Sequence, residues 1–139
     1  MQPSFELFDH TADMGIRARA ATLPGLLAPA GEGLYAVIGE LVAAAESKPL
    51  VFNLTANDSA ELLRDYLSEL LTLFDRDALR FTALEVHVFS ERCLSLTVHT
   101  AHLDKQRSSF RREVKAITYH QLAIRPVAGG YEATVIVDI

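Results

Sequence analysis

The chain has 139 residues, half of them apolar, and a formal net charge of −5. A chain of this length buries a sizeable core, and we expect one domain over residues 1–139. The acidic balance disfavours a general nucleic-acid binder, and no apolar run approaches the roughly 18 residues that span a membrane.

The amino-terminal segment and the cysteine content indicate a cytoplasmic protein. The segment MQPSFELFDH lacks the basic start and apolar core of a signal peptide. Cys93 is the only cysteine, so it cannot form an internal disulfide, and we expect it to be a small buried residue. These features predict a cytoplasmic location without membrane contact.

The chain begins with two short strands separated by a polar loop. Residues 4–8 place Phe5 and Leu7 on one face, and residues 16–20 alternate apolar and basic side chains. Gly15 permits a tight backbone at their junction. The pattern predicts two half-buried strands.

A weak helix and a third strand come next. Thr22 can cap a helix that we expect to continue to about Val42, with a kink near Pro29. Three glycines lower its helical propensity. Residues 49–56 are rich in apolar and β-branched side chains, which favours a strand.

The second helix has the clearest pattern in the chain. Asp58, three residues before Glu61, forms a capping box at its start. Apolar side chains then recur at helical spacing, so one face of this helix belongs to the core: Leu63, Tyr66, Leu67, Leu70, Leu71 and Phe74.

From residue 80 onward the apolar period switches to two. Residues 80–89 and 93–103 predict a hairpin, and a polar, basic connection covers residues 104–112. Alternation over residues 113–124 and 131–139 predicts two further strands. Strands outnumber helices and the last four are consecutive, so we expect an α+β fold with a largely antiparallel β-sheet and two α-helices packed on it.

Two clusters of carboxylates are the best candidates for chemistry. Asp9, His10 and Asp13 lie at the first strand junction, and Asp138 precedes Ile139, the last residue of the sequence. Carboxylates that approach one another repel unless a cation or hydrogen-bond donors offset their charge, and oxygen ligands favour Ca²⁺ or Mg²⁺. His10 could instead indicate zinc or acid–base chemistry. The alternative is that these are turn-forming and exposed terminal residues.

Four segments resemble the archease family, in the same order and over the full length: DHTADMGI, LLRDYLSELLTLFD, VKAITYH and VIVDI. The resemblance implies a small α+β sandwich of a sheet and two helices. It also implies a protein partner, the GTP-dependent tRNA-splicing RNA ligase, which joins RNA ends bearing a 3′-phosphate or 2′,3′-cyclic phosphate. On this hypothesis the protein is not an enzyme but an activator that promotes guanylylation and turnover of the ligase.

The resemblance also implies a set of site residues. Its metal ligands, for Ca²⁺ or alternatively Mg²⁺, correspond to Asp13, Asp138 and Ile139. The remaining residues of the matching motifs are supporting or partner-facing candidates: His10, Lys115 and His120. We expect Lys115 and His120 on opposite faces of one strand, and we favour Lys115 as the one that faces the site.

The chain departs from the family pattern after its fifth strand. Ala101 and Ser108 stand near positions where the family usually carries an acidic residue and a histidine. The basic residues of the 104–112 connection could contact the ligase or its RNA, or form a solvated loop: Lys105, Arg107, Arg111 and Arg112.

Two other functional classes are kept as alternatives. One is a small divalent-metal-dependent phosphatase or phosphodiesterase that uses Asp13 and Asp138 with His10 as base. The other is a general chaperone, which would suppress aggregation of unrelated proteins. Familiar nucleophile, phosphate-loop and zinc motifs are missing from the sequence.

Overall fold

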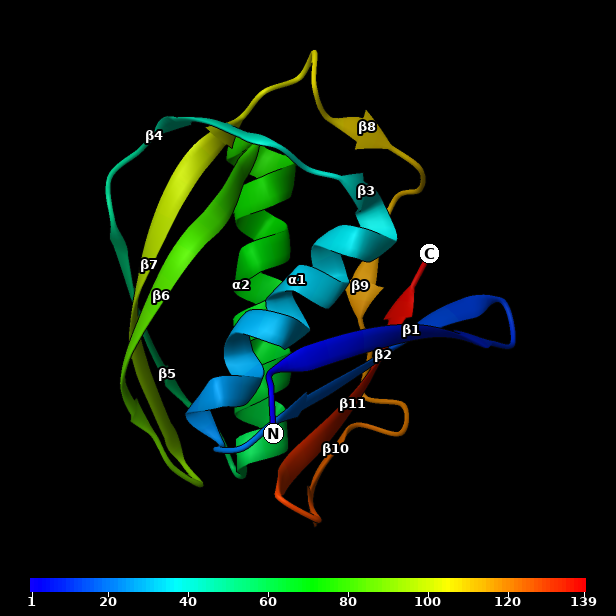
Figure 1. Ribbon diagram of the computed structural model, residues 1–139, viewed down its shortest axis with the longest axis vertical. Helices are drawn as coiled ribbons and strands as arrows, with labels where there is room; N and C mark the ends of the chain where they lie inside the picture. Colours follow the sequence, from blue (N-terminus) through cyan, green and yellow to red (C-terminus); the bar gives the residue numbers. More distant parts are fainter.

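The computed structural model describes all 139 residues and has two helices lying between two antiparallel sheets (Figure 1). The α+β class and the two helices agree with the sequence-based prediction. The strands, however, divide between two main sheets instead of forming one. Apolar side chains of both helices and of the inner sheet faces form one contiguous core.

One sheet brings the two ends of the chain together. Its strand order is β1-β2-β11-β10, with β9 also paired to β11. All pairings are antiparallel. Its strands are β1 (Ser4–His10), β2 (Asp13–Ala20), β9 (Ala116–Ile117), β10 (Ala123–Val127) and β11 (Gly130–Asp138).

The second sheet is built around β7. Strand β7 pairs with β6 on one side and with β4 and β5 on the other, which confirms the hairpin expected over residues 80–103. Its strands are β4 (Ala43–Glu46), β5 (Leu50–Thr55), β6 (Leu79–Phe89) and β7 (Cys93–Leu103). A separate short ladder joins β3 (Gly39–Glu40) to β8 (Ser109–Phe110).

Helix α2 (Ser59–Asp77) confirms Asp58 as the N-cap residue and confirms the apolar face. The Glu61 N–H donates to Asp58 Oδ1 over 2.8 Å. The Tyr66 hydroxyl is buried and donates to the Leu27 carbonyl of the other helix over 2.8 Å. Burial of the apolar face therefore fixes α2 in the core.

The first helix is shorter than the sequence indicated. A 3₁₀ turn at Pro24–Leu26 leads into α1 (Leu27–Ile38), and the Gly25 N–H donates to Thr22 Oγ1 over 3.1 Å. The helix stops at Gly39 instead of about Val42, because β8 packs directly against that position. A Cβ atom at Gly39 would collide with the Ser109 carbonyl.

The strand expected over residues 113–124 is also wrong. Two short strands, β9 and β10, stand in its place, separated by a turn in which Gln121 has φ of 51°. The Thr118 N–H and hydroxyl both donate to the Ile136 carbonyl, which ends the β9 ladder and turns the chain away.

Cys93 is exposed, contrary to the expectation of a buried residue. Its side chain points outward from β7, whereas Leu94, Leu96 and Val98 on the same strand face the core. None of the helices is both long enough and apolar enough to cross a membrane.

Candidate functional site

The tip of the β1–β2 hairpin and the end of β11 meet at one end of the five-stranded sheet (Figure 1). His10 pairs with Asp13 across the hairpin, and Ala12 adopts φ of 67° in the turn between them. Val137 pairs with Met14. The next step of the same register places Asp138 opposite Asp13, so the two carboxylate clusters of the sequence converge.

The electrostatics of this sheet end favour a cation. Directly opposed residues on antiparallel strands have Cβ atoms about 4.5–5.5 Å apart and point to the same face of the sheet. Asp13, Asp138 and Ile139 are all partly buried. The His10 ring is the neighbour of Asp13, with Nδ1 3.8 Å from Oδ2. Asp138 forms no ion pair, so a carboxylate that approaches it at this sheet end meets repulsion unless a cation or a hydrogen-bond donor offsets the charge.

His10 leaves a polar atom unsatisfied beside Asp13. Its Nδ1 is buried without a hydrogen-bond partner, and its Nε2 lies 3.1 Å from Gln121 Nε2. When the Gln121 amide donates to Nε2, the neutral ring carries its proton on Nδ1, directed toward Asp13. Gln121 was not among the predicted site residues, because only the turn at its positive φ brings it to His10.

The donor set fits a hard cation better than zinc. No three His, Cys, Asp or Glu side chains gather into a group that could hold a metal ion. Two aspartates and the carboxylate of Ile139 would supply oxygen ligands only, which Ca²⁺ and Mg²⁺ prefer. His10 then lies beside the site, with Nδ1 3.8 Å from Asp13 Oδ2.

Lys115 and His120 do not share a strand, which corrects the expectation of opposite faces. The Lys115 N–H donates to the Asp138 carbonyl over 2.7 Å, so this residue lies at the sheet end, and its side chain is exposed. The His120 N–H donates to Thr118 Oγ1 in the turn after β9, and its side chain is exposed as well. Both side chains are accessible to a partner.

Ala101 and Ser108, which stand where the family pattern has other residues, both make contacts within the fold. Ala101 is buried in β7, opposite Arg80. Ser108 accepts the Val42 N–H over 2.9 Å through its hydroxyl. Ala101 therefore belongs to the other sheet, and Ser108 anchors the segment before β4.

The basic connection is partly tied to the protein. Arg111 pairs with Glu40 at 3.3 Å, and Arg112 donates to the Val37 carbonyl. Lys105 and Arg107 are exposed. The side chains of Lys105 and Arg107 are therefore accessible to a partner, whereas Arg111 and Arg112 contact the protein itself.

A network of charged side chains covers the same outer face as the aspartates, and the sequence analysis did not identify it. Glu132 is buried and accepts from Arg125 and Arg19 at 2.7 and 2.8 Å. Arg125 and then Arg19 hold the pKa of Glu132 below its ordinary value despite the desolvation. A hydrogen bond from Arg17 similarly lowers the pKa of Glu6. The basic and acidic members of these pairs lie on neighbouring strands. Their pairing can be recognised only once the register of the strands is known.

Aromatic packing links this network to the sheet end. The Arg17 guanidinium lies 4.4 Å from the centroid of the Phe8 ring. The ring covers Gly15, where any Cβ atom would collide with it. Glycine at this position therefore lets Phe8 lie flat beside the hairpin tip.

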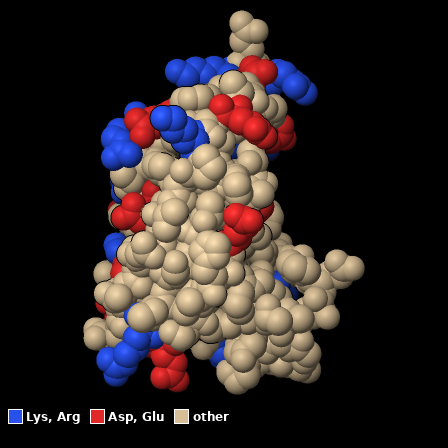
Figure 2. All heavy atoms as spheres, turned by 90° about the vertical axis from the view of Figure 1, so that its left-hand side faces the viewer, with Lys and Arg blue, Asp and Glu red and all other residues tan.

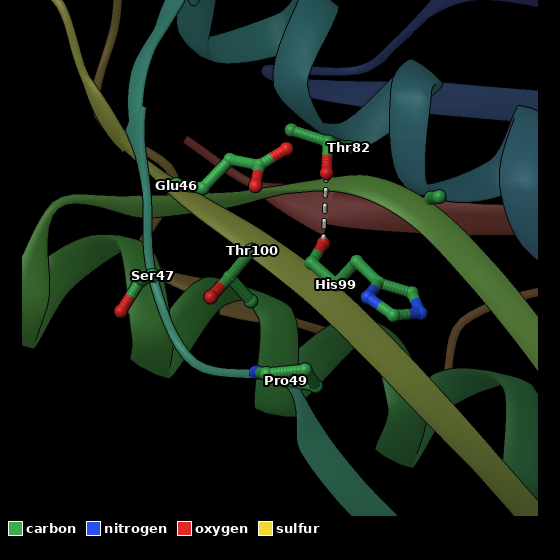
Figure 3. Close-up of a pocket in the computed structure, with 7 residues that line it drawn as sticks. Glu46, Ser47, Pro49, Thr82, His99 and Thr100 are labelled. Atoms are coloured by element: carbon green, nitrogen blue, oxygen red, sulfur yellow. Dashed lines mark hydrogen bonds between the residues drawn. The ribbon is translucent and has the colours of Figure 1, made fainter.

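A polar hollow on the other sheet carries no site chemistry. A cavity of about 360 Å³ opens on the β4–β6–β7 side, lined by Glu46, Ser47, Pro49, Thr82, Ala83, His99 and Thr100 (Figure 3). The His99 ring points away from Glu46 and pairs instead with Glu85 at 3.2 Å. None of the predicted site residues lines this cavity.

The outer face of the four-stranded sheet is largely uncharged. Figure 2 shows charged side chains at the ends and along one margin of this face, with uncharged residues over most of the area between them. Val51 is 62% exposed and Val88 is 48% exposed on it. Exposed apolar side chains grouped on one face are a feature of interaction surfaces.

The sequence is similar to proteins of one family along nearly its whole length. Residues 5–139 match the model of the archease protein family. The chain is 32% identical to the protein archease of Methanosarcina mazei, with 97% of this chain and 95% of that protein aligned. It is 33% identical to the protein archease of Methanothermobacter thermautotrophicus, with 97% and 98% aligned.

Two solved structures share the fold. The solution structure of protein 1598 of Methanobacterium thermoautotrophicum matches with a TM-score of 0.77 and 29% identity, covering 98% of this chain and 99% of that chain. A crystal structure from Thermotoga maritima, described as an archease and possible chaperone, matches with a TM-score of 0.71 and covers 96% of both chains. At 16% identity the second match supports the fold alone.

Proposed function

This chain belongs to the archease family, and on that premise we propose that it is a non-catalytic activator of the GTP-dependent tRNA-splicing RNA ligase. In this role it promotes guanylylation and turnover of the ligase in tRNA splicing or RNA repair in the cytoplasm. The observation that carries the proposal is the meeting of the β1–β2 hairpin tip with the end of β11. That meeting places the carboxylates of two distant motifs at one accessible end of the sheet.

Asp13 and Asp138 would hold a divalent cation there, most simply Ca²⁺, together with the carboxylate of Ile139. When bound, the cation neutralises the carboxylates and offers open coordination positions to a partner's oxygen atoms. The other roles at this site belong to residues of the chain itself. His10 lies beside Asp13, and the Lys115 N–H donates to the Asp138 carbonyl while the Lys115 side chain is exposed. His120 extends the accessible surface around the same sheet end.

The test is guanylylation of purified ligase from the same organism, followed with and without this protein. Asp13→Ala should lose stimulation without losing stability in chelator, because a hairpin-tip aspartate is not part of the core and its removal relieves charge repulsion. Glu91→Ala, at an exposed acidic residue in the turn between β6 and β7, is the control and should stimulate normally. Full stimulation by Asp13→Ala would remove the metal site from the proposed function.

The chain end offers an independent test of the same site. An extension after Ile139 converts the terminal carboxylate into a peptide link, whereas an extension before Met1 leaves it intact. The first form should bind Ca²⁺ more weakly by calorimetric titration and stimulate the ligase less. Equal Ca²⁺ binding by both forms would exclude Ile139 as a ligand.

An enzymatic alternative uses the same residues. A metal-dependent phosphatase or phosphodiesterase would turn over phosphate esters without the ligase, with His10 as base. Screens with Ca²⁺, Mg²⁺ and Zn²⁺ distinguish the two functions, since an activator releases no product on its own. Ligase-independent, Asp13-dependent hydrolysis would overturn the activator proposal.

A chaperone-like activity is the second candidate, favoured by the uncharged outer face of the four-stranded sheet (Figure 2). Exposed Val51 and Val88 on that face could contact apolar segments of other proteins. If so, Val51→Lys should reduce suppression of aggregation of an unrelated client protein while leaving ligase stimulation unchanged. Identical suppression by wild type and variant would exclude this face.

A further inference from the structure

Strands β1 and β5 are the sheet edges without an interruption, and of these only β1 belongs to the sheet that carries the β1–β2 hairpin tip. Strand β10 contains Pro126, and the register of β6 on β7 shifts between Phe81 and Ala83 and again between Val86 and Val88. The register of β4 on β7 shifts as well. Proline and bulges are devices by which proteins prevent an edge from pairing with another chain. Three edges are therefore protected against pairing.

The β1 edge carries neither device. Its seven residues pair in unbroken register with β2, from Ser4 opposite Arg19 to His10 opposite Asp13. None of the backbone hydrogen bonds formed outside the helices and strands involves residues 4–10. Because β1 is the last strand of its sheet, its outward N–H and C=O groups have no partner in the protein. They form a template for one more extended strand.

An apolar groove runs beside this edge. It has a volume of about 450 Å³ and lies between β1 and α1, lined by Pro3, Ser4, Phe5, Ala28, Pro29 and Glu32. The alternation of side chains along β1 places Phe5 on the side of the sheet that faces α1, yet Phe5 is 39% exposed. A strand added next to β1 would alternate its side chains, and those on the α1 side would enter this groove.

Charge and position decide between possible occupants. Glu6 is paired with Arg17 and Glu32 with Arg80, but Asp9 is exposed and has no ion-pair partner. A second copy of the protein would bring another net charge of −5 to this edge. A segment with a basic residue opposite Asp9 avoids this repulsion. Strand β1 also leads from the groove directly to His10, so a chain bound along it arrives at the candidate site (Figure 1).

We propose that the free edge of β1 binds an extended segment of the partner protein by strand addition, with an apolar side chain in the β1–α1 groove and a basic side chain near Asp9. The inference rests on the proposed function, since it takes the ligase as that partner. Strand addition would fix the direction of the bound segment and deliver the adjoining part of the ligase to the hairpin tip. The backbone pairs supply affinity, and the groove supplies selectivity.

Hydrogen exchange on full-length protein tests this directly, with purified ligase as the probe. In the free protein the outward amides of residues 4–10 should exchange rapidly, and in the complex they should slow by at least about tenfold. A complex that forms and activates the ligase without slowing these amides would overturn strand addition while leaving the proposed function standing. Absence of any complex would instead contradict the proposed function. Protection that rises with the concentration of this protein alone would assign the edge to a second copy.

A pair of variants tests the groove. Ala28 is exposed on the first turn of α1, so Ala28→Arg fills the groove with a residue that favours helix. It should weaken ligase binding by about tenfold or more. Ala44→Arg, at an exposed alanine of β4 in the other sheet, is the matched control and should bind normally. Equal binding by both variants, each with a wild-type melting temperature, would refute the groove contact.

Discussion

Replacing Asp138 by asparagine is expected to change the stability of the protein in opposite directions with and without a cation. The register places Asp138 opposite Asp13, at a Cβ separation of about 5 Å. Two unit charges at about 5 Å repel by roughly 1 kcal/mol in water and roughly 3 kcal/mol at an effective dielectric constant of 20. Since both side chains are partly exposed, we expect the lower value.

The measurement is urea denaturation of wild type and Asp138→Asn in chelator and in excess Ca²⁺. In chelator the variant should be more stable by about 1 kcal/mol, which is a midpoint shift of roughly 0.5 M for a slope near 2 kcal/mol/M. Ca²⁺ at about 100 times its dissociation constant should stabilise wild type by roughly 2.7 kcal/mol. The variant, with one ligand fewer, should gain much less.

The control is Asp9→Asn, which removes a charge from the same hairpin without facing Asp138. Its response to Ca²⁺ should equal that of wild type. A variant at Asp138 that is less stable than wild type in chelator would show that the two carboxylates do not repel each other. An unchanged Ca²⁺ response would show that Asp138 does not bind the ion.

Three further predictions concern the core, the charge network and the basic connection. Leu70→Ala removes a fully buried side chain of α2 and should lower the free energy of unfolding by roughly 2–5 kcal/mol; an unmoved denaturation midpoint would contradict the packing. Because Arg125 holds the pKa of Glu132 low, the contribution of Glu132 to stability is present above about pH 4.3 and is lost as pH falls through the lowered pKa. Glu132→Gln should therefore lose roughly 1–3 kcal/mol near neutral pH, and chemical denaturation should show this gap closing in acid; a gap independent of pH would contradict the assignment. Charge reversal of Arg111 and Arg112 to glutamate should weaken ligase association and flatten its salt dependence if the connection docks there; unchanged affinity at low salt would leave a solvated loop.

The candidate site could be predicted only in part from the sequence. The carboxylate clusters at Asp13 and Asp138 are visible as residue types, and the family resemblance joined them. Their proximity depends on the pairing of β11 with β2, which no local pattern encodes. The approach of Gln121 to His10 depends on a turn at positive φ. Glutamine is an unusual residue at such a backbone angle, so nothing in its neighbourhood predicted it.

The sequence by itself determined the elements whose signals are local. The N-cap residue of α2, its apolar face and the β6–β7 hairpin follow from spacing within about twenty residues, and the structure confirms each. Tertiary structure alone decided where α1 stops, because β8 packs against Gly39, and why residues 113–124 break into two strands, because Thr118 binds the Ile136 carbonyl. It also decided which edge stays open and which carboxylates meet. These outcomes depend on strand order and register, which arise from contacts between residues far apart in the chain, whereas periodicity records only which side of an element faces the core.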